Sequence, residues 1–209
     1  MKIAIIGAGK VGRTLGTGWA VKGHEITFGV RDTTAANVKD HLAKAGSNAK
    51  SASAEAAARW ADVIALAVPW AAVKDVIGNL GDLRGKVLLD CTNPVSEWPG
   101  IDHAKGKSGG EQVAAWAAGA RVVKIFNTTG YENMANPRYE MERLAMLYAG
   151  DDVEAKTIAH ALAEDLAFEP QDVGPLTNAH LLEVLASLWG VLAYGQKLGR
   201  GIGFRLLRR

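Results

Sequence analysis

Short apolar runs alternate along the chain with segments of helical periodicity. The runs that we expect to form buried strands are Ile3–Ile6, Glu25–Phe28, Ala61–Val68, Lys86–Cys91 and Arg121–Phe126, with weaker patterns at Leu144–Ala149 and Ala167–Val173. Strands that alternate with helices are typical of a parallel sheet covered by helices on both faces. The pattern therefore predicts an α/β fold of the Rossmann type, with a doubly wound, mostly parallel sheet.

Helix signals fill the intervals between these runs. Val11–Val21 has the periodicity of an amphipathic helix. Ser108 and Glu111 fit a capping box, in which the serine hydroxyl and the glutamate carboxylate each satisfy a backbone amide at a helix start. Further along, Asp151 and Glu154 place acidic charge at the positive end of another expected helix.

The last expected helix is apolar over an unusually wide surface. It begins near Pro175, a residue favoured in the first turn of a helix. Spacings of four, three and four put four leucines on one face: Leu181, Leu185, Leu188 and Leu192. Leu182, Trp189 and Val191 widen the apolar surface beyond that stripe. Because such a helix needs a second partner, we expect a homodimer that forms through this C-terminal helix.

A glycine-rich segment directly follows the first apolar run. Residues 7–12 read GAGKVG, which matches the G-x-G-x-x-G pattern between a strand that ends at Ile6 and a helix. Gly7 allows the tight turn, Gly9 lets backbone amides approach a pyrophosphate, and Gly12 lets the helix lie close to the strand. A glycine-rich turn without a ligand is the alternative, but the strand–helix–strand context favours a dinucleotide.

The end of the second expected strand bears on which dinucleotide binds. A ribose 2′-hydroxyl is recognised by a carboxylate there, whereas a 2′-phosphate is recognised by a cation. Residues 28–30 contain no acid, and Arg31 follows them, with hydroxyl donors at Thr33 and Thr34. Asp32 is the opposing observation, because it can turn inward toward a ribose or serve as a turn acid. The charge pattern favours NADP over NAD.

Composition narrows the class of protein. The 209 residues suffice for one domain and a small appendage, which we place at residues 1–174, an NADP-binding Rossmann domain, and 175–209, a C-terminal helical segment. We expect a cytoplasmic protein, because no apolar run approaches the roughly 18 residues of a membrane span and the N-terminus lacks a signal-peptide pattern. We expect neither a nucleic-acid nor a membrane partner. The single cysteine excludes an internal disulfide framework and a cysteine-based zinc site.

The chain resembles the NADPH-dependent reductases of the 8-hydroxy-5-deazaflavin coenzyme and the cytosolic reductase domain of the six-transmembrane metalloreductases. The stretches that carry the resemblance are GAGKVG at 7–12, GHEITFGVRD at 23–32, AVPW at 67–70, KIFNT at 124–128, YAGDD at 148–152, DVGPL at 172–176 and GIGF at 201–204. These stretches sample nearly the whole chain, and the C-terminal ones are more specific than the glycine motif.

The resemblance implies an NADP-dependent oxidoreductase that transfers hydride between nicotinamide and a deazaflavin or flavin ring such as FMN or FAD. Hydride transfer between stacked rings needs proximity more than an acid, and the sequence offers no convincing general acid. From the motif and the resemblance together, we expect the following residues to bind the cofactor: Gly7, Ala8, Gly9, Lys10, Val11, Gly12, Arg31, Thr33, Val68, Pro69, Trp70, Asn93 and Asn127. We expect no catalytic side chain and no metal ligand.

Two other functions stay open. Asn127 stands where deazaflavin reductases often carry histidine and metalloreductase-like members carry asparagine, which leaves room for another small acceptor, such as an imine or a metal chelate. A dinucleotide-sensing module without catalysis is the other. Cys91 is expected to be a buried apolar residue, and the irregular segment 92–107, with Trp98, is a candidate lid.

Overall fold

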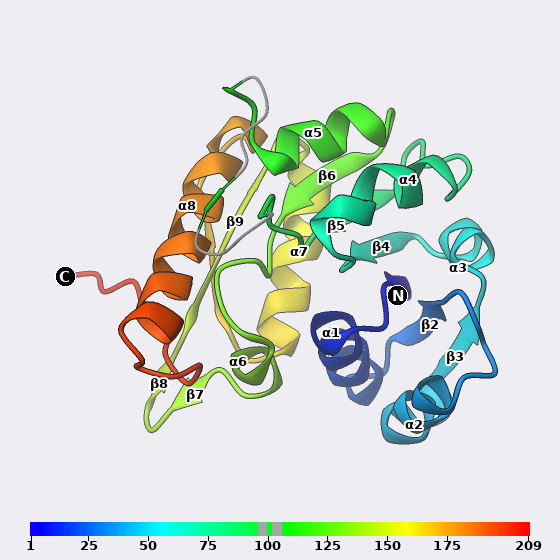
Figure 1. Ribbon diagram of the computed structural model, residues 1–209, viewed down its shortest axis with the longest axis horizontal. Helices are drawn as coiled ribbons and strands as arrows, with labels where there is room; N and C mark the ends of the chain where they lie inside the picture. Colours follow the sequence, from blue (N-terminus) through cyan, green and yellow to red (C-terminus); the bar gives the residue numbers. More distant parts are fainter. Residues whose placement is uncertain (96–99, 102–105) are drawn as a thin grey trace.

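The computed structural model describes residues 1–95, 100, 101 and 106–209, with Ala36, Asn37 and His41 described by their backbone alone. Within this part of the chain, one eight-stranded sheet has the order β10-β9-β6-β5-β4-β1-β2-β3. Its strands are β1 (Lys2–Ile6), β2 (Glu25–Gly29), β3 (Ala49–Ala52), β4 (Val63–Leu66), β5 (Val87–Asp90), β6 (Arg121–Lys124), β9 (Ala145–Gly150) and β10 (Glu169–Asp172). Figure 1 shows β9, β6, β5 and β4 on one side of the N-terminal strand, and β2 and β3 on the other. Neighbouring strands are parallel except β6 and β9, so the predicted doubly wound, mostly parallel sheet is confirmed.

Helices cover both faces of this sheet. They are α1 (Lys10–Val21), α2 (Ala36–Ala45), α3 (Ala54–Trp60), α4 (Val73–Gly78), α5 (Gly109–Trp116), α6 (Tyr131–Ala135), α7 (Val153–Asp165) and α8 (Ala179–Gly190). Alternation along β1 sends Ile3 and Ile5 into a core with α1 and α7. The opposite face of β1, with Ala4 and Ile6, packs in a second core with α3, α4 and α5.

The strands buried on both faces are those with the clearest apolar runs in the sequence. All residues of β4 and β5 are buried, as expected for central parallel strands. The predicted run Ala61–Val68 contains β4 but extends beyond it at both ends. β3 and α2 were not predicted from the sequence. The edge strand β3 reads Ala-Lys-Ser-Ala and lacks apolar alternation.

Side-chain caps begin three of the helices. The Ser53 side chain accepts a hydrogen bond from the Ala56 amide at the start of α3. The capping box of Ser108 and Glu111 begins α5 as predicted. At α7 the capping side chain is Asp152, which accepts from the Ala155 amide at 2.7 Å.

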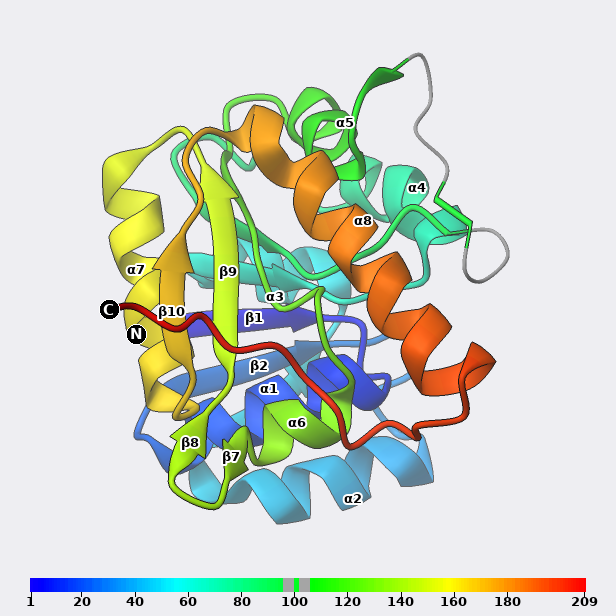
Figure 2. The ribbon, with the colours of Figure 1, turned by 90° about the vertical axis from the view of Figure 1, so that its left-hand side faces the viewer.

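The C-terminal helix runs beside α5 and β9 (Figure 2). Its buried face carries Leu182, Ala186 and Trp189. The predicted leucine stripe lies on the other side, with Leu181 54% and Leu188 47% exposed. The stripe is therefore real, but packing within the chain uses the neighbouring face.

The residues after α8 return to the sheet. Trp189 Nε1 donates to the Ile202 carbonyl at 2.8 Å, and the Ala145 amide of β9 donates to the Phe204 carbonyl at 2.9 Å. By length and composition, one helical stretch of the described chain, Leu176–Gly195, is apolar enough to cross a membrane, and 44% of its most apolar window is buried inside the protein. The boundary between residues 174 and 175 stays a prediction.

Candidate functional site

A crevice opens at the carboxyl ends of β1, β2 and β4, where the connections after β1 and β4 diverge to opposite faces of the sheet. Such a switch point is where doubly wound folds bind their ligands. The cavity measures about 570 Å³. Its lining includes six of the residues predicted from the sequence to bind the cofactor: Gly7, Ala8, Gly9, Arg31, Val68 and Pro69.

The three motif glycines serve three different steric needs. Gly7 has φ +103°, and a Cβ there would lie 2.6 Å from the Ala67 carbonyl oxygen. A Cβ on Gly12 would lie 1.9 Å from the Gly7 carbonyl oxygen, so the helix requires glycine to approach the loop. Around Gly9 a Cβ would meet nothing within 4 Å, which leaves open space above the loop. This is the space in which a pyrophosphate would lie.

The first turn of α1 borders this space. Gly9 is its N-cap and provides no side-chain hydrogen bond to the helix amides. Amides at a helix start that have no cap favour an anionic ligand. Lys10 and Val11 do not line the crevice, because the Lys10 ammonium lies 5.2 Å from the centre of the Tyr131 ring and Val11 packs against the core. That Lys10 and Val11 bind a cofactor therefore stays a prediction, and the part of these residues near the loop is their backbone.

The segment after β2 contains a cation, Arg31, and a carboxylate, Asp32, and only the carboxylate is hydrogen-bonded within the turn. The exposed Arg31 side chain lines the crevice and makes no hydrogen bond or ion pair with the described residues. Asp32 accepts from the Thr34 amide at 2.8 Å and from the Thr34 hydroxyl at 2.7 Å. These hydrogen bonds lower the pKa of Asp32. Asp32 is therefore a turn acid that stays ionised, and Thr33 is exposed outside the lining.

The opposite wall comes from the end of β4. Val68 and Pro69 line the cavity. Trp70 is turned toward Trp116, with ring centroids 5.5 Å apart and planes tilted by 38°. This contact gives Trp70 a packing role on the outer side of the wall.

Asn93 and Asn127 join the ends of β5 and β6. Asn127 Nδ2 donates to Asn93 Oδ1 at 3.0 Å, and Asn93 Nδ2 donates to the Asn127 carbonyl at 2.9 Å. Asn127 is 5% exposed, and its Oδ1 has no partner among the described residues. The pair lies outside the lining of the crevice, and the two predicted residues are hydrogen-bonded to each other.

Three buried charges beneath this pair were not predicted as part of a site. Lys124 Nζ lies 2.9 Å from Asp90 Oδ2 and 3.0 Å from Glu183 Oε1, and all three side chains are fully buried. Burial disfavours the ammonium, but the two carboxylates outweigh that effect and raise the pKa of Lys124. The sequence does hold a signal: Asp90 and Lys124 each directly follow apolar strand residues, and Glu183 is the sole acid of the largely apolar α8.

Other candidate side chains have structural surroundings. Burial raises the pKa of the Cys91 thiol, so this cysteine is not poised as a thiolate. His24 contacts Asp165, and His160 contacts Tyr148. Within the described part of the chain, no cluster of histidine, cysteine and acidic side chains could hold a metal ion. Trp98 and half of the candidate lid, residues 96–99 and 102–105, lie outside the described residues.

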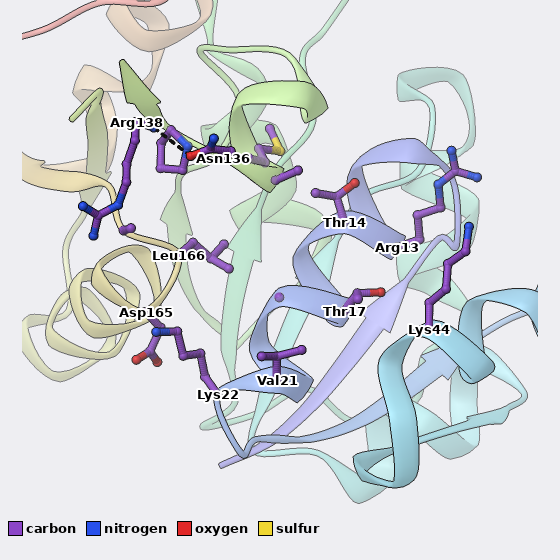
Figure 3. Close-up of a pocket in the computed structure, with 15 residues that line it drawn as sticks. Arg13, Thr14, Thr17, Val21, Lys22, Lys44, Asn136, Arg138, Asp165 and Leu166 are labelled. Carbon is purple, nitrogen blue, oxygen red and sulfur yellow. Dashed lines mark hydrogen bonds between the residues drawn. The ribbon is translucent and has the colours of Figure 1, made fainter. Parts of the chain in front are cut away.

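A larger cavity of about 660 Å³ lies along α1 (Figure 3). Four cations line it, namely Arg13, Lys22, Lys44 and Arg138, together with Asp165, which is paired with His24 at 2.8 Å. It shares no lining residue with the crevice and contains none of the predicted cofactor-binding residues. Because the smaller crevice contains predicted cofactor-binding residues and the larger cavity does not, we take the crevice as the candidate site.

A glycine loop, an uncapped helix start and an unpaired arginine after the second strand define the class of protein: a dinucleotide-binding Rossmann domain with the features of the NADP-dependent oxidoreductases. The comparisons agree with this class. Residues 2–94 match the model of the family described as NADP oxidoreductase, coenzyme F420-dependent.

Two solved structures and one curated protein extend the likeness beyond that segment. An inferred F420-dependent NADP reductase from Arthrobacter sp. FB24 is 28% identical, covers 100% of both chains and superposes with a TM-score of 0.89. The protein SMa0349 from Sinorhizobium meliloti is 26% identical over 86% of this chain and 88% of its own, with a TM-score of 0.76. Metalloreductase STEAP3 from Rattus norvegicus is 29% identical over 88% of this chain.

The chain spans 36% of the length of the rat metalloreductase. The resemblance predicted from the sequence, to F420-dependent NADP reductases and to metalloreductases, is confirmed by these likenesses.

Proposed function

We propose that the protein is an NADP(H)-dependent oxidoreductase that transfers hydride between nicotinamide and a deazaflavin or flavin ring. The observation that carries the proposal is the free Arg31 guanidinium, which borders the same crevice as the open space over Gly9. A guanidinium forms strong charge-assisted hydrogen bonds to phosphate. The likeness to the Arthrobacter protein, which extends over the full length of both chains, supports the deazaflavin as acceptor.

In the proposed reaction, the chain's own residues bind and orient the cofactor. When bound, NADPH supplies the hydride; the amides at the α1 start hold its phosphates, and Arg31 pairs with the 2′-phosphate. Among the described residues that line the crevice, the ionisable side chains are Arg31 and Asp32. Asp32 cannot act as a proton donor near neutral pH, because its hydrogen bonds to Thr34 lower its pKa. Such a site suits direct hydride transfer, for which proximity is the main requirement.

Stopped-flow spectroscopy tests this proposal. The purified protein is mixed with NADPH and 8-hydroxy-5-deazaflavin, and in parallel with NADPH and FMN or FAD. We expect bleaching of the acceptor absorbance together with loss of the absorbance of the reduced nicotinamide. An unchanged spectrum with all of these acceptors rules the proposal out.

A reductase of another small acceptor is the second candidate, and Asn127 motivates it. A buried amide at the end of β6 offers no proton-transfer group, so an imine or a metal chelate would have to be reduced without help from this residue. The same NADPH oxidation assay with an imine panel and with ferric chelates distinguishes this candidate. Turnover with these acceptors alone favours it.

A dinucleotide-sensing module remains the third candidate. Such a module would bind the dinucleotide in the same crevice and would transfer hydride to no acceptor. Binding of NADPH by calorimetry, combined with no oxidation by any acceptor in the panels, would identify this function.

A further inference from the structure

Lys124, Asp90 and Glu183 form a network of fully buried charges. Burying ionised side chains costs free energy, so we looked for a role of this network other than stability. Desolvation of buried ions usually offsets their attraction, and an apolar trio of the same volume would stabilise a core as well or better. Glu183 is the sole acid of α8, a helix whose other buried residues are small or apolar. Its carboxylate reaches the site by two separate routes.

The first route runs through Lys124 to the turn after β5. Lys124 Nζ donates to the Thr92 carbonyl at 2.6 Å. Asp90 Oδ1 accepts from the Thr92 amide at 3.0 Å and from the Thr92 hydroxyl at 2.6 Å. Thr92 is therefore held at three atoms, and the next residue is Asn93, which bonds to Asn127 in both directions.

The second route runs through the start of α5. Glu183 Oε2 accepts from the Gly109 amide and Oε1 from the Gly110 amide, both at 3.0 Å. A Cβ on Gly109 would lie 2.9 Å from Glu183 Oε1 and 3.1 Å from the Pro94 ring. Only glycine lets the carboxylate hold the helix start this close to Pro94. Glu183 thus supports residues 92–94 from both sides.

Resting on the proposed function, we propose that Glu183 is a positioning residue for hydride transfer. Through Lys124 and through the start of α5 it fixes the turn of residues 92–94, and with it the Asn93–Asn127 pair at the ends of β5 and β6. These strand ends lie beside the switch point, on the side where the nicotinamide and its partner ring would meet. The adenosine end, with Arg31, lies outside the network.

Glu183→Gln tests the proposal, since it keeps the shape of the side chain and removes its charge. The side-chain amide signals of Asn93 and Asn127, followed by ¹H–¹⁵N NMR without any cofactor, should shift. The rate of hydride transfer at saturating NADPH should fall about 10- to 100-fold, the range expected when a reacting geometry is displaced by about 1 Å. The Kd for NADPH should change less than twofold, because the phosphate contacts are untouched.

Leu162→Ala is the matched control. Leu162 is fully buried in α7, in the other core, and its truncation lowers stability without touching the network. We expect this variant to leave both asparagine signals and the transfer rate unchanged. Should Glu183→Gln fail to fold, Glu183→Asp keeps the charge and withdraws it by one methylene, with the same readouts.

Unmoved asparagine signals and an unchanged rate in the Glu183 variant overturn the proposal. Equal losses of rate in Leu162→Ala and Glu183→Gln, in proportion to stability, also overturn it, because they indicate a merely structural role. If the wild-type protein transfers no hydride to any acceptor, the proposed function fails and the NMR shifts alone decide the positioning role.

Discussion

Arg31 is the residue on which cofactor choice depends. Its side chain lines the crevice without a partner in the described chain, whereas the neighbouring Asp32 is engaged by Thr34. We expect Arg31→Ala to weaken NADPH binding by about 1.5–3 kcal/mol, the value of a hydrogen bond to a charged group, with little effect on NADH. Calorimetric titration with both nucleotides measures this difference. Equal losses for the two would contradict the NADP assignment.

Gly9 is predicted to matter for space rather than for backbone conformation. Its φ of −72° is open to any residue, and a Cβ would touch nothing. We therefore expect Gly9→Val to fold normally and to weaken NADPH binding at least tenfold, since the side chain would fill the pyrophosphate position. Gly201→Val is the control, because its Cβ also meets open space but lies outside the crevice lining. Circular dichroism and nucleotide titration of both variants separate folding from binding.

The residues that could be predicted from the sequence are those whose chemistry is local. The roles of Gly7 and Gly12 follow from one motif, and the structure places both against backbone atoms that exclude a Cβ. The role of Asp32 was open, because the sequence alone does not distinguish an aspartate that stabilises a turn from one that binds a ribose. Its two hydrogen bonds to Thr34 decide between them.

At the element scale, the start of α5 provides a measurable cap. Ser108 and Glu111 bond reciprocally, and the Ser108 amide is the main cause of a lowered pKa of Glu111. Ser108→Ala should cost about 1 kcal/mol of unfolding free energy. Because the folded-state pKa is depressed, the contribution of Glu111 is present above its ordinary value of 4.5 and is lost as pH falls through the folded value. Ser108→Ala keeps the backbone amide and loses the hydroxyl that donates to the Glu111 carboxylate, so only the part of the deficit due to that bond should disappear in acid. Urea unfolding of the variant at pH 7 and in acid measures this part.

The link between β5, β6 and α8 predicts a larger effect. Lys124→Met would leave Asp90 and Glu183 buried without their cation. We expect a loss of about 3–5 kcal/mol in unfolding free energy, since removal of one partner strands the other charges. Chemical denaturation measures this loss. A variant as stable as the wild type would show that the carboxylates find other partners.

Element prediction succeeded where burial imposes a pattern and failed where it does not. β4 and β5 are apolar throughout because helices cover both of their faces. The edge strand β3 has one neighbour, β2, and its four residues carry no such pattern. Its pairing with β2 is what makes it a strand.

At the scale of the whole molecule, we propose that the outward face of α8 joins two copies of the chain. Leu181, Val184 and Leu188 are each about half exposed on this face. Leu188→Lys should then raise the dissociation constant of a homodimer at least tenfold, because a charge would be buried between subunits. Light scattering over a concentration series measures the mass. Leu207→Lys, at a 72% exposed tail position, is the control, and a monomeric wild-type protein would refute the interface.

Short-range periodicity and neighbouring residues were enough to predict the sheet-and-helix alternation, the glycine loop and the cation that follows the second strand. Tertiary structure alone decided which face of α8 packs inward, that Asn93 meets Asn127, and that Glu183 reaches Lys124 across 59 positions of the chain. These contacts join segments far apart in sequence, and their partners are fixed by how helices and strands stack, which no local pattern encodes.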